Sequence, residues 1–121
     1  MVRAIRGAIT VEANEEQEIL DNTCELLKEM TVQNGIEKED IISIIFSLTS
    51  DLNAAFPAVA ARMMGWTDIA MMCTHEVDVP GSLRKCIRVM MHFNTDKRNK
   101  ELKYIYLKEA RRLRPDLVKQ E

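Results

Sequence analysis

The sequence lacks the features of several protein classes. Its three cysteines, Cys24, Cys73 and Cys86, include no CxxC pair, so neither a disulfide framework nor a paired-cysteine metal site is indicated. The longest uncharged runs, 41–50 and 52–61, are about half the length that spans a bilayer. Arginines interrupt the apolar start of the chain, which is unlike a secretory signal. We therefore expect a cytoplasmic protein with reduced thiols and no membrane partner.

The sequence also lacks an excess of positive charge. Its 17 Lys and Arg stand against 19 Asp and Glu, a net charge of −2, which argues against a nucleic-acid partner. The 121 residues suit a single domain over 1–121, and we expect 115–121 to form a flexible C-terminal tail. A chain of this length does not enclose a deep pocket, so any active site should be shallow or completed by another subunit.

Apolar residues alternate or run together in four segments, which is typical of β-strands. The four segments are 2–11, 41–48, 69–76 and 86–94. The run Ile41–Leu48 is dense in β-branched residues, so we expect this strand to be buried on both faces. In the last segment, Ile87–Phe93 places four apolar residues on one parity and Arg88 on the other. A charge among mostly apolar neighbours calls for a partner or a ligand.

Two further segments have helical features. Apolar residues recur at helical spacing over 19–30, Asn14–Gln17 is typical of a capped helix start, and Gly35 provides a stop. A second, short helix is predicted over 57–64, opened by its proline and closed by Gly65.

The segment 101–112 fits a helix loosely and a strand equally well. The order strand, helix, strand, short helix, strand, strand and final element indicates an α+β fold with a mixed β-sheet, one long helix and one short helix.

Motifs for covalent or metal chemistry are missing. The residues Cys73, His75, Glu76 and His92 include metal-binding atoms, but no paired ligand spacing recurs. Neither a Gly-x-Ser-x-Gly motif nor a phosphate-binding glycine pattern is present, and no obvious base lies beside a serine or cysteine.

Arginine does occur where a charge should be costly. Arg6 and Arg88 lie within apolar strands, and Arg114 directly precedes a proline. Each could pair with a buried carboxylate such as Glu76 or lie on a solvated edge. Together with Tyr106, the three suggest a pocket for an anion with carboxylate groups, because guanidinium binds such groups with two parallel hydrogen bonds.

Short motifs then occur in a fixed order along the chain. They are Ile5-Arg-Gly-Ala8, Thr10-Val-Glu12, Asp51-Leu52, Phe56-Pro-Ala58, Arg62, Gly65-Trp66, Cys73, Glu76, Asp78-Val79, Cys86-Ile-Arg-Val-Met-Met91, Thr95-Asp96, Tyr106-Leu107 and Leu113-Arg-Pro-Asp-Leu117. No single motif is diagnostic, but the ordered set closely resembles the monofunctional bacterial chorismate mutases of the pseudo-α/β-barrel class, not those of the all-helical class.

The resemblance implies a homotrimer in which three mixed sheets surround a barrel-like core, with an active site in each cleft between neighbouring subunits. It implies the cofactor-free Claisen rearrangement of chorismate to prephenate, on the route to phenylalanine and tyrosine. It also implies that the ambiguous segment near Tyr106 is a strand.

This reaction fits the residues. A pericyclic rearrangement needs no nucleophile, metal or redox cofactor, and an arginine-rich pocket suits the two carboxylates of chorismate. The carbon–oxygen bond breaks ahead of carbon–carbon bond formation, which leaves negative charge on the ether oxygen. A preorganised cation there stabilises the transition state more than the ground state, and the pocket must also hold the compact, reactive conformer.

The resemblance assigns roles to individual residues. Arg88 matches the arginine at the ether oxygen, Arg6 the arginine that binds a carboxylate, Tyr106 its hydroxyl partner, and Glu76 the glutamate that receives the ring hydroxyl. The remaining substrate contacts are Cys73 beside Glu76, Phe56 over the ring, Arg62 and Arg114 at the charged rim, Leu113 in a covering stretch, and Ala58 and Met72.

This sequence departs from the family pattern at a few positions. Val59 replaces a lysine near the site entrance, Met72 replaces a threonine, and the segment before Gly65 is one residue shorter. Two other readings remain open. The chain could be a noncatalytic trimer that binds a carboxylate metabolite, because fold does not fix function. It could also be a small metal protein that uses Cys73, His75 and His92.

Overall fold

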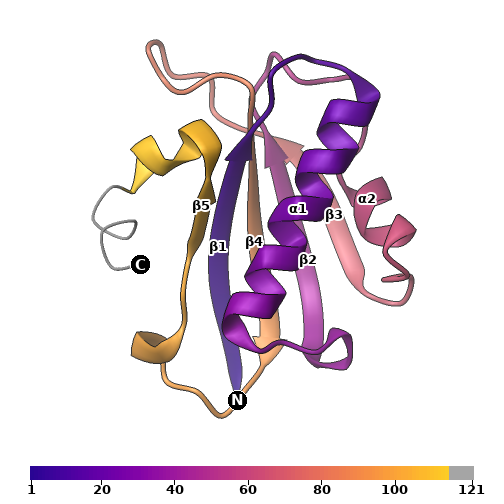
Figure 1. Ribbon diagram of the computed structural model, residues 1–121, viewed down its shortest axis with the longest axis vertical. Helices are drawn as coiled ribbons and strands as arrows, with labels where there is room; N and C mark the ends of the chain where they lie inside the picture. Colours follow the sequence, from indigo (N-terminus) through magenta and orange to yellow (C-terminus); the bar gives the residue numbers. More distant parts are fainter. Residues whose placement is uncertain (115–121) are drawn as a thin grey trace.

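The computed structural model describes residues 1–114 as a mixed five-stranded sheet with both α-helices on one face (Figure 1). The strands are β1 (Val2–Thr10), β2 (Ile41–Leu48), β3 (Ala70–His75), β4 (Cys86–Asn94) and β5 (Ile105–Leu107). Their order across the sheet is β3-β2-β4-β1-β5. Strand β4 runs antiparallel to β1 and β2, whereas the edge strands β3 and β5 run parallel to their neighbours. The expected tail, 115–121, lies outside the described residues.

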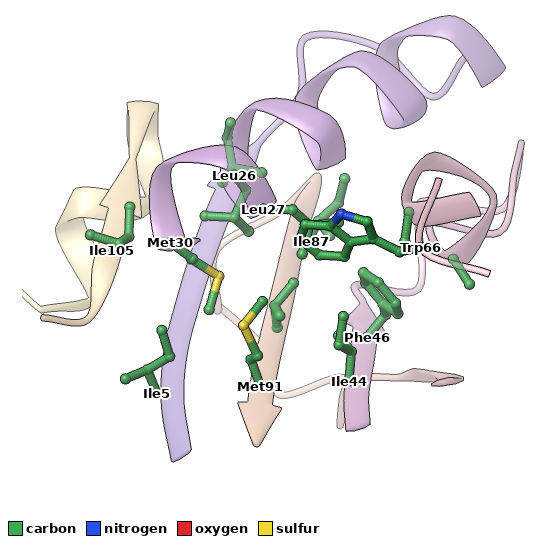
Figure 2. Close-up of a cluster of buried hydrophobic side chains, with 14 of the residues drawn as sticks. Ile5, Leu26, Leu27, Met30, Ile44, Phe46, Trp66, Ile87, Met91 and Ile105 are labelled. Carbon is green, nitrogen blue, oxygen red and sulfur yellow. The ribbon is translucent and has the colours of Figure 1, made fainter. Parts of the chain in front are cut away.

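The long helix α1 (Glu16–Asn34) packs across the sheet through the apolar residues that predicted it. Figure 2 shows Leu26, Leu27 and Met30 above Ile5 of β1 and Met91 of β4. All five side chains are fully buried. Gly35 ends the helix in the left-handed conformation, with φ of 62°, as its sequence predicted.

The predicted cap at the start of α1 is wrong. The residue before the helix is Glu15, and its side chain makes no capping hydrogen bond. Asn14 instead contacts the connection after β2, where its Oδ1 accepts the backbone N–H groups of Asn53 and Ala54, both at 3.0 Å. Asn14 therefore bonds the connection after β2 and does not cap α1, because its single amide oxygen cannot reach both sets of backbone N–H groups.

The short helix α2 (Ala58–Met63) follows Pro57 as predicted, and Gly65 closes it with φ of 86°. It packs beside α1 on the same face of the sheet, where Trp66 covers Phe46 (Figure 2). None of the helices within residues 1–114 is long and apolar enough to cross a membrane.

The expectation that β2 is buried on both faces is wrong for this chain. Ile44, Phe46 and Leu48 lie in the core, but Ile42 and Ile45 are 41% and 37% exposed. The reason is that α1 and α2 cover one face of the sheet, called here the helix face (Figure 1). On the other face the segment Lys108–Leu113 packs over Ala8, Cys86 and Tyr106, and the part formed by β2 and β3 is left uncovered. We call this second face the open face.

The ambiguous segment after residue 100 divides into two elements. Strand β5 pairs with β1 through Ile105–Leu107, which confirms the strand near Tyr106, and a 3-10 helix, η3 (Lys108–Leu113), follows at once. Lys108 makes the turn between them with φ of 56°, and its Nζ donates to Oδ1 of Asn22 in α1. Two further 3-10 helices, η1 (Lys38–Asp40) and η2 (Asn99–Glu101), lie in connections.

The close approach of α1 to β1 depends on Gly7. A Cβ atom at this position would lie 2.7 Å from Sδ of Met30 and 3.2 Å from the carbonyl oxygen of Ile105. We therefore expect Gly7→Ala to lower the free energy of unfolding by about 1–3 kcal/mol, because the core has no room for the added methyl group. Urea denaturation at a fixed protein concentration measures the change.

The variant Met30→Ala provides the matched control, because it removes the Sδ atom that would lie nearest to the added methyl group. The cost of Gly7→Ala should be smaller in the Met30→Ala background than in the wild type, which is a double-mutant coupling. An unchanged midpoint for Gly7→Ala alone would contradict the close-packing argument.

Candidate active site

The open face presents Arg88 and Tyr106 in one row across the sheet. In the strand register, Arg88 of β4 faces Ala8 of β1, and Ala8 faces Tyr106 of β5. On its other side Arg88 faces Ser47 of β2. Adjacent strands lie about 4.8 Å apart, so the small Ala8 side chain separates Arg88 and Tyr106 by roughly 10 Å between Cα atoms.

A second row, two residues along the strands, carries Arg6. This residue of β1 faces Met90 of β4, which faces Ile45 of β2, and Ile45 faces Met72 of β3. The three apolar members are exposed, Met72 to 63% and Met90 and Ile45 each to 37%. The open face therefore combines cationic groups with uncovered apolar surface.

Arg88 is paired with Glu76, the residue that follows β3. Its Nε lies 3.3 Å from Oε1 of Glu76, and the two side chains are 42% and 26% exposed. This Nε is itself buried and makes no hydrogen bond of acceptable geometry within residues 1–114, so the contact is an ion pair only. The carboxylate fixes the guanidinium from one side, and the exposed remainder is accessible to an anion.

The space beside this ion pair is small in a single chain. A cavity of about 20 Å³ is lined by both members of the pair together with Thr49, Ser82 and Leu83. That volume holds about one water molecule and no organic dianion. One chain alone therefore lacks the walls of a substrate pocket around Arg88.

Arg6 and Tyr106 have different environments on the open face. Arg6 is exposed, and its guanidinium carbon lies 5.2 Å from the centre of the Tyr104 ring. This cation–π contact restricts the arginine, and the sequence prediction did not single out Tyr104 as a neighbour of Arg6. The signal was present, because Tyr104 and Tyr106 share one strand parity. Tyr106 is 6% exposed.

A small second core surrounds Tyr106. It contains Ala8, Cys86 and Ala110, with Leu113 packed against it. Burial raises the pKa of the Cys86 thiol to about 11, so this group is neutral near pH 7 and unsuited to nucleophilic attack. Cys86 is thus a packing residue.

The C-terminal candidate residues, Leu113 and Arg114, lie at the end of η3. Leu113 is half-buried and also lines a groove of about 800 Å³ beside Thr10 and Arg112. Arg114 is half-buried at the end of η3. This segment thus lies on the β1 and β5 side of the molecule, next to Tyr106 and away from β3.

Two of the remaining predicted residues, Phe56 and Cys73, line a different cavity, and Ala58 and Arg62 belong to the adjoining helix α2. A largely apolar pocket of about 520 Å³ is lined by Phe56, Val59 and Cys73 together with Leu20 and Leu52. Phe56 is 69% exposed, Ala58 is buried at the start of α2, and Arg62 is exposed on the same helix. Cys73 pairs with Phe46 in the strand register, which places it on the helix face.

The predicted site thus consists of two groups that one chain does not bring together. The open-face group is Arg6, Glu76, Arg88 and Tyr106, and the loop group is Phe56, Ala58, Arg62 and Cys73. Cys73 and Glu76 are near in sequence, but strand alternation turns their side chains to opposite faces of the sheet. Met72 lies on the open face of β3.

The structure separates the residues of the possible metal site. His75 lies on the helix face with Cys73, and its Nε2 is 3.2 Å from the carbonyl oxygen of Leu52. His92 lies on the open face, with Nδ1 3.2 Å from Oγ of Ser43. Within the part of the chain that the structure describes, no group of three or more His, Cys, Asp or Glu side chains could hold a metal ion.

Sequence comparisons with known proteins find one family. The family model described as chorismate mutase type I matches residues 2–117. Chorismate mutase AroH of Bacillus subtilis (strain 168) is 45% identical over 118 residues, which are 97% of this chain and 93% of that protein. Chorismate mutase AroH of Thermus thermophilus is 48% identical over 118 residues, 97% of each chain.

A solved structure extends the similarity to three dimensions. A chorismate mutase from Clostridium thermocellum superposes with a TM-score of 0.89 and 62% sequence identity, covering 90% of this chain and 97% of that one. The chain belongs to the type I chorismate mutase family, and it is a chorismate mutase, an isomerase.

Proposed function

We propose that this enzyme converts chorismate to prephenate at sites shared between the subunits of a homotrimer, with Arg88 as the cation at the ether oxygen. The observation that carries the proposal is the division of the site. The open-face group has charge but no pocket walls, and the loop group has an apolar pocket but lacks Arg88 and Tyr106. In an assembly, a neighbouring copy can supply the loop group to the open-face group of the first chain, and the reverse.

Arg88 is well suited to stabilise developing negative charge. It belongs to β4, which is held by β1 on one side and β2 on the other, so its backbone position is fixed before substrate binds. The Glu76 carboxylate restrains its guanidinium at 3.3 Å. A fixed cation needs little reorganisation as the ether bond breaks, and its interaction strengthens as charge accumulates on the oxygen.

The other open-face residues serve to hold the substrate. In this mechanism Arg6 binds one carboxylate, steadied by the Tyr104 ring, and Tyr106 donates its hydroxyl to the same group. The Glu76 carboxylate accepts a hydrogen bond from the hydroxyl group on the chorismate ring. These contacts favour the compact conformer in which the two reacting carbons are close.

The loop group supplies the apolar side of the pocket. Phe56 and Ala58 cover the ring, Cys73 contributes a further contact, and Arg62 adds charge at the rim. Met72 contacts the substrate from the open face. From the C-terminal segment, Leu113 and Arg114 complete the cover. This mechanism uses neither a metal nor a redox cofactor.

Assembly through the open face is supported by its apolar surface. Ile45, Met72 and Met90 lie side by side across three strands and are exposed in the single chain. An uncovered apolar row across neighbouring strands marks an interaction site. In the proposed trimer, this row faces the neighbouring copies. We also propose that the enzyme acts in the cytoplasm, which the three free cysteines support.

A turnover assay separates the enzyme from a noncatalytic binder. Purified protein is mixed with chorismate in the presence of a chelator, and prephenate formation is followed. We expect catalysed conversion unaffected by the chelator. An uncatalysed rate would contradict the proposed function and favour a carboxylate-binding protein.

The role of Arg88 is tested by its removal. We expect Arg88→Ala to reduce kcat about 100- to 1,000-fold, because the ether oxygen loses its preorganised cation. The matched control is Arg98→Ala, which removes an exposed arginine at the start of η2 that does not line the cavity beside Arg88. That variant should stay within about twofold of the wild type. Near-wild-type turnover of Arg88→Ala with an intact trimer would exclude the assigned role.

Subunit complementation tests the shared site. Arg88→Ala inactivates the open-face group, and Phe56→Asp inactivates the loop group by placing a carboxylate beside the substrate's own. In a cyclic trimer of both variants, one interface combines two intact halves, so co-expression at equal levels should restore about a quarter of the wild-type sites.

The control pairs two variants in the same half. Because Arg88 and Glu76 form an ion pair within one chain, co-expression of Arg88→Ala with Glu76→Ala should restore no activity. Absence of recovery in the first pair, with mixed trimers demonstrated by mass, would mean that the site lies within one subunit.

A further inference from the structure

The connection after β2 is bonded to the residue that precedes β4. Both carboxylate oxygens of Asp51 accept the backbone N–H of Lys85, Oδ1 at 3.2 Å and Oδ2 at 3.0 Å. The hydroxyl of Thr49 also donates to Oδ1 of Asp51, at 2.5 Å. One carboxylate therefore joins two segments that are 34 residues apart in sequence.

Lys85 needs such a restraint because its backbone is strained. Its φ is 49°, in the left-handed region that costs a residue with a side chain about 1–2 kcal/mol. The strand β4 begins at the next residue, and its direction depends on this conformation. A charged acceptor on the Lys85 N–H stabilises the strained turn.

Thr49 extends the same restraint into β4. Its hydroxyl oxygen accepts the N–H of Cys86 at 3.0 Å, and its own N–H donates to the carbonyl of Cys86 at 3.1 Å. The hydroxyl proton points to Asp51, which leaves a lone pair for Cys86. Thr49 is 7% exposed and Cys86 is fully buried, so these bonds are shielded from water.

Both members of the catalytic ion pair are attached to this junction. Arg88 follows Cys86 by two residues on β4, and the N–H of Glu76 donates to the carbonyl of Leu48, next to Thr49, at 2.7 Å. A shift of the junction would therefore move the guanidinium and the carboxylate relative to each other. Arg6 and Tyr106 are held by other strands and have no direct bond to Asp51.

We infer that Asp51 is a positioning residue, which sets the placement of Arg88 and Glu76 through Lys85 and Thr49 without touching the substrate. This inference rests on the proposed function of Arg88. It predicts that Asp51 contributes to the chemical step more than to substrate binding, because it acts on the cation at the ether oxygen and not on the carboxylate contacts.

The test is Asp51→Asn, which preserves size and one acceptor oxygen but loses the charge and the second acceptor. We expect kcat to fall about tenfold, with KM within about twofold, in a protein that remains folded and trimeric. In the Arg88→Ala background, the same substitution should lower the residual rate little, because the residue on which Asp51 acts has gone.

Lys85→Gly provides a rescue. Glycine adopts a φ near 49° without strain, so the turn at residue 85 depends less on the hydrogen bonds to Asp51. Lys85→Gly also removes the bond from Lys85 Nζ to the carbonyl oxygen of Glu12, at 3.1 Å, so the effect of Asp51→Asn is measured within that background. Asp51→Asn should lower kcat less in the Lys85→Gly background than in the wild type.

Asn14→Ala is the matched control for general loosening of the same connection. It removes the bonds from the backbone N–H groups of Asn53 and Ala54, at 3.0 Å each, and the bond from its own Nδ2 to Oδ1 of Asn53, at 2.8 Å, none of which reaches β4. We expect a lowered melting temperature and, because Asn53 and Ala54 line the Phe56 pocket, a raised KM with kcat within about twofold of the wild type. The inference is overturned if Asp51→Asn keeps its kcat, or if both variants lose kcat equally. If instead Arg88→Ala is fully active, the proposed function itself fails.

Discussion

The antiparallel register of β4 between β1 and β2 determines where the charged groups of the site lie. It sets Arg88 opposite Ala8 and Ser47, and it turns Ile87 and Val89 into the core beneath α1. A slip of one residue in this register would bury the Arg88 guanidinium and expose Ile87 and Val89. Packing of these apolar residues on the helix face therefore fixes the position of Arg88 on the open face. Stability and catalysis therefore depend on the same pairing.

Sequence periodicity was sufficient for most of the fold. The parity of β4 was predicted correctly, as were the helix over α1 and the glycine ends at Gly35 and Gly65. The burial of β2 was predicted incorrectly. A dense β-branched run does not reveal whether its second face is covered by a helix of the same chain or by another copy of the chain. The start of α1 failed because Asn14 has a long-range partner that no local pattern contains.

The sequence indicated candidate residues for the site but not their arrangement. Arg6 and Arg88 were selected because charges on apolar strands need an explanation, and Glu76 was selected through the family resemblance; the structure places all three at the open face or its edge. Strand alternation alone could not show that Cys73 and Phe56 border a separate pocket. Nor could it find Asp51, whose importance depends on the left-handed backbone of Lys85, a residue 34 positions away.

The exposed methionines of the open face have a chemical consequence. Met72 and Met90 are accessible in the single chain, and oxidation would turn their apolar thioethers into polar sulfoxides. In the proposed trimer the neighbouring copies shield this surface. A newly synthesised subunit is thus vulnerable to oxidants until it assembles, and a sulfoxide formed in that interval would exclude the subunit from the assembly that would have protected it.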